Sequence, residues 1–464
     1  MKIGWISLGC PKNQVDTEYL IGMMGEEGYA YTSDPGSADI LVINTCSFIQ
    51  TATQESIDTI LEFAQFKQGN CKLLVVVGCF PQRYGQELVA EIPEVDLWLG
   101  TGEYSRLPEL IKSKLKEENT EKMYLQAPAG WLPPEFENKP ISTPPYRAYV
   151  KIAEGCDNRC LYCIIPQLKG RYRSRKPETI LKEVKALLAK GVKEITLVAQ
   201  DTTAYGQDLP GENNLAQLLS SLDKLEGEFW LRILYTYPSR ITDQLLKVIK
   251  DSKHICHYLD IPLQHVSPKV LQRMGRRTAV GEIKQMLERI KKLVPDMAIR
   301  TTFILGYPGE TEEEFREVLS FLEEYRLDWV GVFPYFREEG TPAAKLHSQV
   351  HHATKKRRAR EVLEKQQAIS SEKNKELIGE EIVVMLEEQL VNSGWTGRSY
   401  REAPEIDGVF KLEEPEDNKI ELKPGSFVIV EITGAEAYQI YGKIKRPFSK
   451  GESFPDVEHS NRSY

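Results

Sequence analysis

The sequence lacks any long hydrophobic run, which excludes a chain built around transmembrane helices. No apolar stretch approaches the ~18 residues that a helix needs to cross a bilayer. The N-terminal stretch Met1–Cys10 has one lysine and then an apolar run that ends at Gly9, which is too short for the core of a signal peptide. We therefore expect a cytoplasmic protein, in which thiols stay reduced and clustered cysteines indicate metal binding or catalysis.

The sequence also lacks a net positive charge, which argues against a chain that grips nucleic acid mainly through phosphates. The formal net charge is −8, and the segment from Glu376 onward carries ten Lys and Arg against eighteen Asp and Glu. An acidic C-terminal part does not suit a phosphate backbone. It suits a basic protein partner better, although an acidic surface can equally serve solubility alone.

Cysteine is scarce, with eight residues in all, but three of them lie close together in a pattern that has no fourth zinc ligand. The stretch Gly155–Cys163 reads GCDNRCLYC and contains Cys156, Cys160 and Cys163. Structural zinc needs four ligands, and the nearest downstream candidates lie far along the chain, at His254, Cys256 and His257. Three thiolates at this spacing instead suit a 4Fe–4S cluster whose fourth iron stays open for a ligand. A disulfide is disfavoured because three is an odd count.

The N-terminal part, residues 1–125, alternates apolar strands with helical patterns. We predict strands at Lys2–Leu8, Asp39–Thr45 and Lys72–Val77, with helices near residues 14–27 and 54–66. This alternation predicts an α/β domain with a parallel sheet and right-handed crossovers. Ligands of such sheets bind outside the carboxyl ends of the strands.

Each of the three predicted strands is followed directly by a cysteine, namely Cys10, Cys46 and Cys79. A lone cysteine is usually a small core residue, but three at equivalent positions belong to the same edge of the sheet. We interpret them as ligands of a second three-thiolate cluster, again with an open iron. Cys71 and Cys256 stand before their strands, and we expect both in the core.

The central part, residues 146–372, follows a proline-rich linker at 126–145 and repeats the strand–helix alternation six times. The predicted helices lie near 177–190, 214–225, 241–251, 279–293 and 311–324. The predicted strands are Arg147–Ala153, Glu194–Ala199, Phe229–Tyr235, His257–Ile261, Ala298–Leu305 and Trp329–Phe336. Six units predict a partial (β/α)6 barrel, with its chemistry at the C-terminal ends of the strands.

Polar or glycine-rich residues follow several of these strands and are candidates for binding a ligand. Gln200 and Asp201 follow the second strand, and Gly306 follows the fifth. Arg300 lies inside the fifth strand, where a buried arginine needs an anionic partner. That partner is either a ligand or a carboxylate of an internal salt bridge, and the sequence leaves both open.

The C-terminal part begins after a basic run, Lys355–Arg360, which suits contact with RNA, contact with an acidic surface elsewhere, or an ordinary solvated helix face. Five short strand-like runs then occupy residues 375–446. They predict a small antiparallel β-barrel of the oligonucleotide-binding type. The tail at 447–464 has the composition of a disordered end.

The CxxxCxxC stretch, placed after the first strand of a six-unit βα region, resembles that of the radical S-adenosylmethionine (SAM) enzymes. The order of a three-cysteine N-terminal domain, a radical SAM core and a small TRAM-like barrel resembles the methylthiotransferases over nearly the whole chain. Their tRNA branch carries Gln-Met-Asn after its first cysteine, where this chain has Pro11-Lys12-Asn13. The RimO branch is similar in the stretches Gln200–Gly206, Gly397–Tyr400 and Ala403–Gly408. Asp157–Arg159 and Arg171–Arg175 are similar to the tRNA branch as well.

The resemblance implies two 4Fe–4S clusters, one on Cys156, Cys160 and Cys163 and an auxiliary one on Cys10, Cys46 and Cys79. It implies that SAM occupies the open iron of the first cluster and that one electron cleaves it to a 5′-deoxyadenosyl radical. It implies that the auxiliary cluster holds or supplies sulfur, while a second SAM provides the methyl group. The residues expected around SAM are Gln200, Asp201, Arg300 and Gly306.

The leading hypothesis is an enzyme that methylthiolates the β-carbon of an aspartate in ribosomal small-subunit protein twelve, with flavodoxin or ferredoxin as electron donor. An alternative acts on adenosine in tRNA, which the basic run would favour. A third reading is a metal-stabilised RNA-binding protein without catalysis. About eight irons per chain would support catalysis, and stoichiometric zinc would support binding alone.

Overall fold

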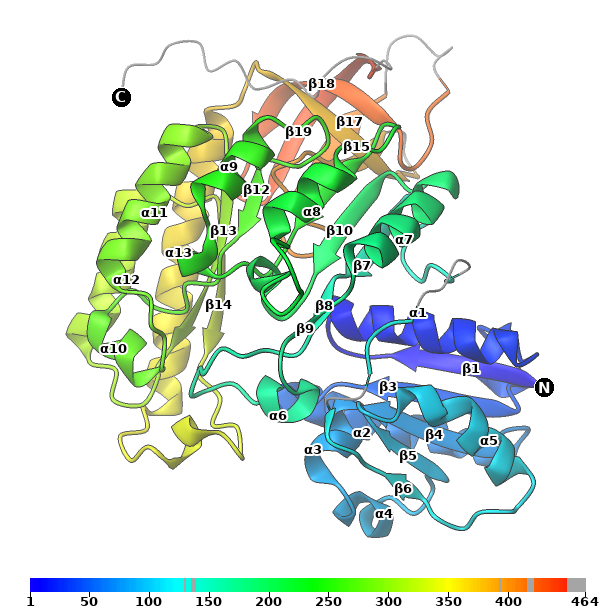
Figure 1. Ribbon diagram of the computed structural model, residues 1–464. Helices are drawn as coiled ribbons and strands as arrows, with labels where there is room; N and C mark the ends of the chain where they lie inside the picture. Colours follow the sequence, from blue (N-terminus) through cyan, green and yellow to red (C-terminus); the bar gives the residue numbers. More distant parts are fainter. Residues whose placement is uncertain (129–130, 135–138, 392–393, 415–420, 449–464) are drawn as a thin grey trace.

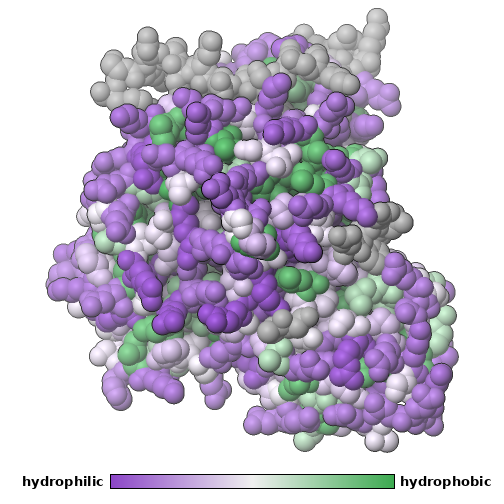
Figure 2. Space-filling view, viewed as in Figure 1, coloured by the Kyte–Doolittle hydropathy of each residue, from purple (hydrophilic) through white to green (hydrophobic). Residues whose placement is uncertain are grey.

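The computed structural model describes residues 1–128, 131–134, 139–391, 394–414 and 421–448. In chain order they form a parallel α/β sheet, a partial barrel and a small closed β-barrel (Figure 1). None of the described helices combines the length and the apolar character that a membrane crossing needs. On the face drawn in Figure 2, hydrophilic residues predominate and apolar ones form small patches, as is normal for a protein surface.

The N-terminal unit is a six-stranded sheet in which every pairing is parallel, in the order β2-β1-β3-β4-β5-β6. Its strands are β1 (Lys2–Ser7), β2 (Ala30–Thr32), β3 (Ile40–Thr45), β4 (Leu73–Gly78), β5 (Leu97–Gly100) and β6 (Met123–Tyr124). The three predicted strands are confirmed as β1, β3 and β4. The sequence analysis did not predict β2, β5 and β6, which are short or lie at an edge.

Both faces of this sheet are buried, because alternate side chains of each strand enter different cores. Val42 and Val77 pack on one face with residues of α1 (Pro11–Glu26) and α5 (Leu107–Leu115). Ile43 and Val76 pack on the other face, which is covered by α2 (Gln50–Ala64), α3 (Cys79–Tyr84) and α4 (Glu87–Glu91). This explains why the strands are continuous apolar runs rather than alternating ones.

The central unit contains all six predicted strands, arranged as two three-stranded parallel sheets, β11-β10-β7 and β12-β13-β14. They are β7 (Arg147–Lys151), β10 (Glu194–Val198), β11 (Trp230–Ile233), β12 (Tyr258–Asp260), β13 (Ala298–Leu305) and β14 (Trp329–Pro334). A parallel bridge between Leu231 and Ile255 joins the two sheets into one open wall. The six-unit partial barrel is therefore confirmed.

Helices cover the outside of this wall (Figure 1). They are α7 (Pro177–Ala189), α8 (Leu215–Leu222), α9 (Asp243–Lys250), α11 (Val280–Leu293), α12 (Glu312–Tyr325) and α13 (His352–Lys375). Four short elements were not predicted: β8 (Ala153–Glu154), α6 (Ile165–Lys169), β9 (Arg173–Ser174) and α10 (Pro268–Arg273). Elements of two to six residues are too short for a periodic pattern to reveal.

The C-terminal unit is a closed five-stranded barrel in the order β15-β16-β17-β19-β18. Its strands are β15 (Glu381–Gln389), β16 (Trp395–Arg398), β17 (Val409–Glu413), β18 (Phe427–Ala435) and β19 (Gln439–Pro447). The predicted antiparallel pairing holds except between β17 and β19, which are parallel. An odd number of strands cannot alternate in direction around a closed ring, so one parallel pair is unavoidable.

The predicted linker and tail differ in how much of them the structure describes. Within 126–145, Trp131 is buried and packs edge-on against Tyr19 and Tyr104, so this part of the linker is ordered against its neighbours. Of the tail predicted to be disordered, residues 449–464 lie outside the described residues. Pro447 ends β19 and Phe448 is buried against Phe427, so the disorder predicted for these first two residues is wrong.

A buried charge cluster joins the N-terminal unit to the central one. Lys151 on β7 forms ion pairs with Asp16 on α1 and with Glu154 on β8. Lys169 lies 3.0 Å from the other oxygen of Asp16. Charges without exposure to water are stable only when each has a partner, so this cluster requires the two units to stay in one relative position. In Figure 1, α1 runs between the N-terminal sheet and the central unit.

A second buried cluster joins the central unit to the barrel. Glu194 on β10 accepts hydrogen bonds from Arg232 on β11 at 2.7 Å and from Arg398 on β16 at 2.6 Å. Asp407, in the loop before β17, accepts from Tyr258 on β12 at 2.7 Å. Arg398 and Asp407 belong to the C-terminal stretches that suggested the family, and their role here is to dock the barrel.

The Glu194→Gln variant should lower the free energy of unfolding by about 3 kcal/mol or more at pH 7, because two buried guanidinium groups lose their charged partner. Burial alone would raise the pKa of Glu194, but the two arginines outweigh it and hold this pKa at about 2, below its usual value of 4.5. The carboxylate therefore stabilises the fold fully above pH 4.5, and this contribution is lost as pH falls toward 2. Urea unfolding of both proteins at pH 7 and pH 5 measures the difference, which should stay constant over that interval.

The matched control is Glu431→Gln, which weakens an exposed ion pair to Lys445 at 2.9 Å on the barrel. Exposed pairs contribute about 1 kcal/mol or less, so this variant should unfold close to the wild-type urea concentration. Equal losses in both variants would show that the Glu194 cluster does not dock the barrel.

Candidate functional site

The three N-terminal cysteines converge at one edge of the sheet, as predicted. Cys10, Cys46 and Cys79 follow β1, β3 and β4, which are neighbours in the sheet. A Cβ added to Gly9 (φ +90°) would lie 2.8 Å from the Cys46 Sγ, so only glycine lets the first loop pass this close to the second cysteine. All three cysteines are free thiols.

Hydrogen bonds hold the loops that carry these cysteines. Ser56 Oγ donates to the Cys46 carbonyl oxygen at 2.7 Å. The Asn13 side-chain amide donates to the carbonyl oxygens of Leu8 and Thr45, at 2.8 and 3.1 Å. Asn13 thus ties the end of β1 to the end of β3.

The second triad lies on the loop after β8 and is anchored at both ends. The Cys156 backbone N–H donates to the Gly170 carbonyl at 3.1 Å, and the Leu161 N–H donates to the Met274 carbonyl at 2.9 Å. Arg276 is buried, with one nitrogen 3.9 Å from the Cys160 Sγ and another donating to the Pro262 carbonyl at 2.7 Å.

Burial raises the pKa of several of these thiols, to about 11 for Cys46 and Cys156 and to about 12 for Cys79 and Cys163. Thiols in such surroundings are protonated and unreactive at neutral pH. A bound metal would reverse this, because a coordinating thiol loses its proton outright. The pattern suits metal ligands better than cysteine nucleophiles.

The N-terminal triad packs against the segment that directly follows the second triad in the chain. Cys79 is buried together with Ile164 and Leu168, and Ile164 directly follows Cys163 in the chain. Thr101, just after β5, donates to the Leu168 carbonyl oxygen at 2.5 Å. The short helix α6, which follows the second triad in the chain, therefore packs against the N-terminal triad.

Gln200 and Asp201 lie at the C-terminal end of β10, beside the second triad. Asp201 is buried and fully partnered, accepting from Asn158 and Arg240 at 2.7 Å each. With these residues it lines a cavity of about 200 Å³. Gln200 donates to Glu154 at 2.6 Å, whereas its side-chain oxygen is buried and has no hydrogen-bond partner. A buried amide oxygen without a partner is a position where a bound ligand could donate.

Arg300 and Gly306 have partners within the protein. Arg300 on β13 lies 3.2 Å from Asp407 and 3.4 Å from Asp260, so the internal salt bridge left open by the sequence is present. The Gly306 N–H donates to Glu310 at 2.8 Å, and this glycine packs against Lys355. Neither residue displays an unmatched group toward the cysteines.

Three cations of the basic run at Lys355–Arg360 have partners within the protein, while Lys356 and Arg360 are exposed. Lys355 is buried and donates to the Tyr335 carbonyl oxygen at 2.8 Å. Arg357 lies 2.8 Å from Glu312, and Arg358 lies 2.7 Å from Glu310. These three cations pack α13 onto the central unit, which favours the structural reading of the run over contact with RNA.

Sequence reasoning missed three features of the site: Arg276 beside Cys160, Lys12 between the units, and the Asp16–Lys151 pair. Lys12 Nζ lies 3.3 Å from the centre of the Tyr235 ring, at the end of β11. A lysine directly after a cysteine–proline pair was visible in the sequence, but its target lies more than two hundred residues away. Such contacts depend on domain docking and leave no periodic signal.

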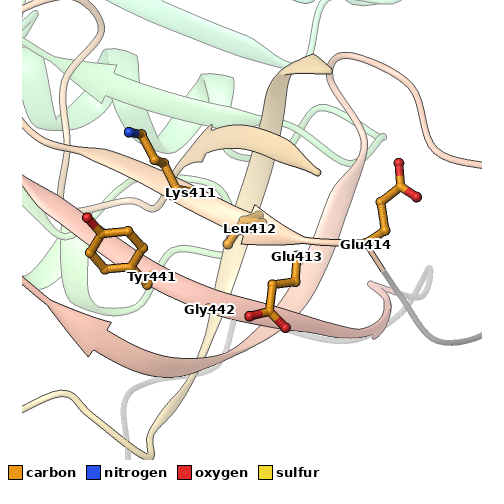
Figure 3. Close-up of a pocket in the computed structure, with 6 residues that line it drawn as sticks. All are labelled: Lys411, Leu412, Glu413, Glu414, Tyr441 and Gly442. Carbon is orange, nitrogen blue, oxygen red and sulfur yellow. The ribbon is translucent and has the colours of Figure 1, made fainter. Parts of the chain in front are cut away.

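A further hollow of about 220 Å³ lies on the barrel, between β17 and β19 (Figure 3). Its lining includes Lys411, Glu413 and Tyr441 and none of the cysteines. None of its lining side chains is among the buried polar groups without a partner. This hollow therefore has no direct part in chemistry at the triads.

Within the described ranges, no three His, Cys, Asp or Glu side chains surround a point suited to one metal ion. A cubane cluster needs a different arrangement, because its three thiolates bind three separate irons. The two groups of three free thiols, carried on hydrogen-bonded loops, are the residues that could hold such clusters.

Comparison with known families divides the chain into three matched segments. Residues 2–100 match the uncharacterized protein family UPF0004, residues 150–322 match the radical SAM superfamily, and residues 378–444 match the TRAM domain.

Curated relatives match over nearly the whole chain. "Ribosomal protein uS12 methylthiotransferase RimO" of Geobacter sulfurreducens is 44% identical, with 96% of this chain and 98% of that protein covered. The protein of the same name from Pelotomaculum thermopropionicum is 46% identical, over 96% of this chain and 99% of its own length.

Solved structures share the fold at low identity. The radical SAM methyltransferase TsrM from Kitasatospora setae superimposes with a TM-score of 0.57 at 14% identity, over 74% of this chain and 75% of its own. The cobalamin-dependent radical SAM enzyme OxsB reaches a TM-score of 0.52 at 15% identity, over 74% and 54% of the two chains. At these identities the likeness describes the architecture alone.

Proposed function

We propose that this chain, which belongs to the RimO family of ribosomal protein uS12 methylthiotransferases, adds a methylthio group to the β-carbon of an aspartate in uS12. The observation that carries the proposal is the contact of Cys79 with Ile164 and Leu168, because it brings the two cysteine triads to one boundary. A sulfur source and a radical source must lie close together if one carbon is to meet both.

The radical SAM match implies one 4Fe–4S cluster and SAM. We assign that cluster to Cys156, Cys160 and Cys163, and a second cluster to Cys10, Cys46 and Cys79. The free thiols and the fixed loops of both triads support this assignment. When bound, the first cluster supplies the one-electron chemistry that cleaves SAM. Such radical chemistry is needed because acid–base catalysis cannot break an unactivated C–H bond.

The chain's own residues position the reacting groups and exclude water. Asp201 holds Asn158 and Arg240 beside the first triad. Gln200 offers an unpartnered oxygen that would accept a hydrogen bond from SAM. Arg300 and Gly306 act through the packing of the strand ends that surround the cofactor. The buried pair of Asp16 and Lys151 keeps the two triads in one relative position.

The proposal extends to partners, location and domain limits. An acidic C-terminal part suits uS12 as a basic protein substrate, and flavodoxin or ferredoxin would supply electrons. Because the proposed substrate is a ribosomal protein, we infer that the enzyme acts in the cytoplasm. The domains are 1–125, the linker 126–145, 146–372 and 375–446. The tRNA alternative is less favoured, because Arg357 and Arg358 of the basic run pair with carboxylates of the same unit.

The test is to reconstitute the protein anaerobically and incubate it with SAM, a reductant and either uS12 or tRNA. We expect a methylthio mass gain on one uS12 peptide and none on tRNA. A replacement of the target aspartate by alanine in uS12 is the control and should abolish the gain. Modification of tRNA without modification of uS12 would overturn the proposal.

A further inference from the structure

Lys12 occupies an unusual place, because it belongs to the N-terminal unit and its ammonium group reaches into the central one. It is the second residue of α1 and lies two residues after Cys10. Its Nζ stands 3.3 Å from the centre of the Tyr235 ring, just past the end of β11. Both side chains are partly exposed, so a ligand entering the boundary between the units could reach them.

The carboxylates that face Lys12 are already engaged elsewhere. The acidic and thiol groups around it are Cys10 and Cys46 on the N-terminal unit, Glu154 on β8 and Asp260 on β12. Glu154 is paired with Lys151 and accepts from Gln200 at 2.6 Å. Asp260 accepts from the Tyr235 N–H at 3.0 Å and lies 3.4 Å from Arg300.

Among the described residues, no carboxylate lies within ion-pair distance of the Lys12 Nζ, which has only the face of Tyr235. The ammonium group of a surface lysine is hydrated, and that of a buried lysine usually pairs with a carboxylate. An ammonium group held over an aromatic ring, two residues from Cys10 and without a carboxylate partner, can receive an anion from outside the chain.

We propose that Lys12 binds the side-chain carboxylate of the target aspartate, an inference that rests on the proposed function. That carboxylate is bonded directly to the β-carbon where the methylthio group is attached. Holding it two residues from Cys10 would bring the reacting carbon toward the N-terminal triad. Lys12 is thus a specificity-determining residue, because it distinguishes a carboxylate from a neutral or aromatic target at the same boundary.

The test measures binding of two uS12 peptides, one with the target aspartate and one with asparagine at that position. Reconstituted wild-type protein should bind the aspartate peptide about tenfold or more tightly, as a charge-assisted hydrogen bond implies. Lys12→Met keeps the length of the side chain and removes the charge, so the two peptides should bind it equally. Lys12→Arg should retain part of the preference. Fluorescence anisotropy gives the six affinities, and iron content confirms that the clusters are intact.

Lys284→Met is the matched control, because Lys284 also lies over a tyrosine ring, 5.4 Å from Tyr325, on the outer helices. It should keep the wild-type preference. Persistence of the preference in Lys12→Met, or its absence in wild-type protein, would overturn the inference. So would a loss of SAM affinity in Lys12→Met as large as its loss of peptide affinity, since Lys12 would then serve the carboxylate of SAM.

These outcomes can be separated from failure of the proposed function. If wild-type protein does not methylthiolate uS12, the proposed function fails and the inference fails with it. If wild-type protein modifies uS12 and Lys12→Met still prefers the aspartate peptide, only the inference fails.

Discussion

The Cys160→Ala variant is expected to lose both SAM cleavage and methylthiolation of uS12 down to background. Its sulfur belongs to the triad that we assign to the SAM-binding cluster, and Arg276 faces it at 3.9 Å. A cluster left with two of its three thiolates would not be retained, so iron should fall from about eight to about four per chain. The measurements are 5′-deoxyadenosine formation, iron and sulfide content, and the mass of the uS12 peptide.

Cys256→Ala is the matched control for this variant, because Cys256 is a buried cysteine of the same unit that belongs to neither triad. It should keep about eight irons and both activities, with only a small loss of stability. Continued SAM cleavage by Cys160→Ala at the wild-type rate would contradict the assignment of the loop triad.

The Cys10→Ala variant should separate the two activities that Cys160→Ala removes together. Cys10 belongs to the N-terminal triad and not to the loop triad, so SAM cleavage should continue near the wild-type rate. Methylthiolation should disappear, because the cluster that we propose to hold the sulfur cannot assemble on Cys46 and Cys79 alone. Iron should again fall to about four per chain, and 5′-deoxyadenosine should form without modified uS12.

Cys71→Ala serves as the control in the same unit. Cys71 is buried in the core on one face of the sheet, where its Sγ lies 3.2 Å from the Leu73 carbonyl oxygen. This variant should retain the wild-type iron content and both activities. Methylthiolated uS12 from Cys10→Ala would show that the N-terminal triad is not the sulfur site.

The two triads illustrate how far sequence reasoning reached. Cys156, Cys160 and Cys163 are recognisable by spacing alone, because they share one loop. Cys10, Cys46 and Cys79 are far apart in the sequence, yet their common place after parallel strands predicts that they meet, and the structure confirms that they do. The N-terminal triad was predicted from the position of each cysteine after a strand, and not from the spacing of the cysteines in the sequence.

The residues expected around SAM illustrate the opposite case. Arg300 was singled out because it is a charged residue inside a strand, but its neighbour Asp407 comes from a loop of another unit. Lys12 drew attention only as part of a family motif, although it reaches Tyr235 across the boundary between units. Which carboxylate pairs with which arginine or lysine depends on how the units dock against each other. This docking produces no periodic pattern in the sequence.

The sequence by itself determined the order of three units, the six strands of the partial barrel and the six cysteines, because apolar periodicity and strand ends are local properties. Only the tertiary structure decided that α6 packs against the N-terminal triad, that Arg358 of α13 pairs with Glu310, and that Lys12 has no carboxylate partner among the described residues. The physical reason is that a buried charge is defined by its partners, and these partners come from distant parts of the chain.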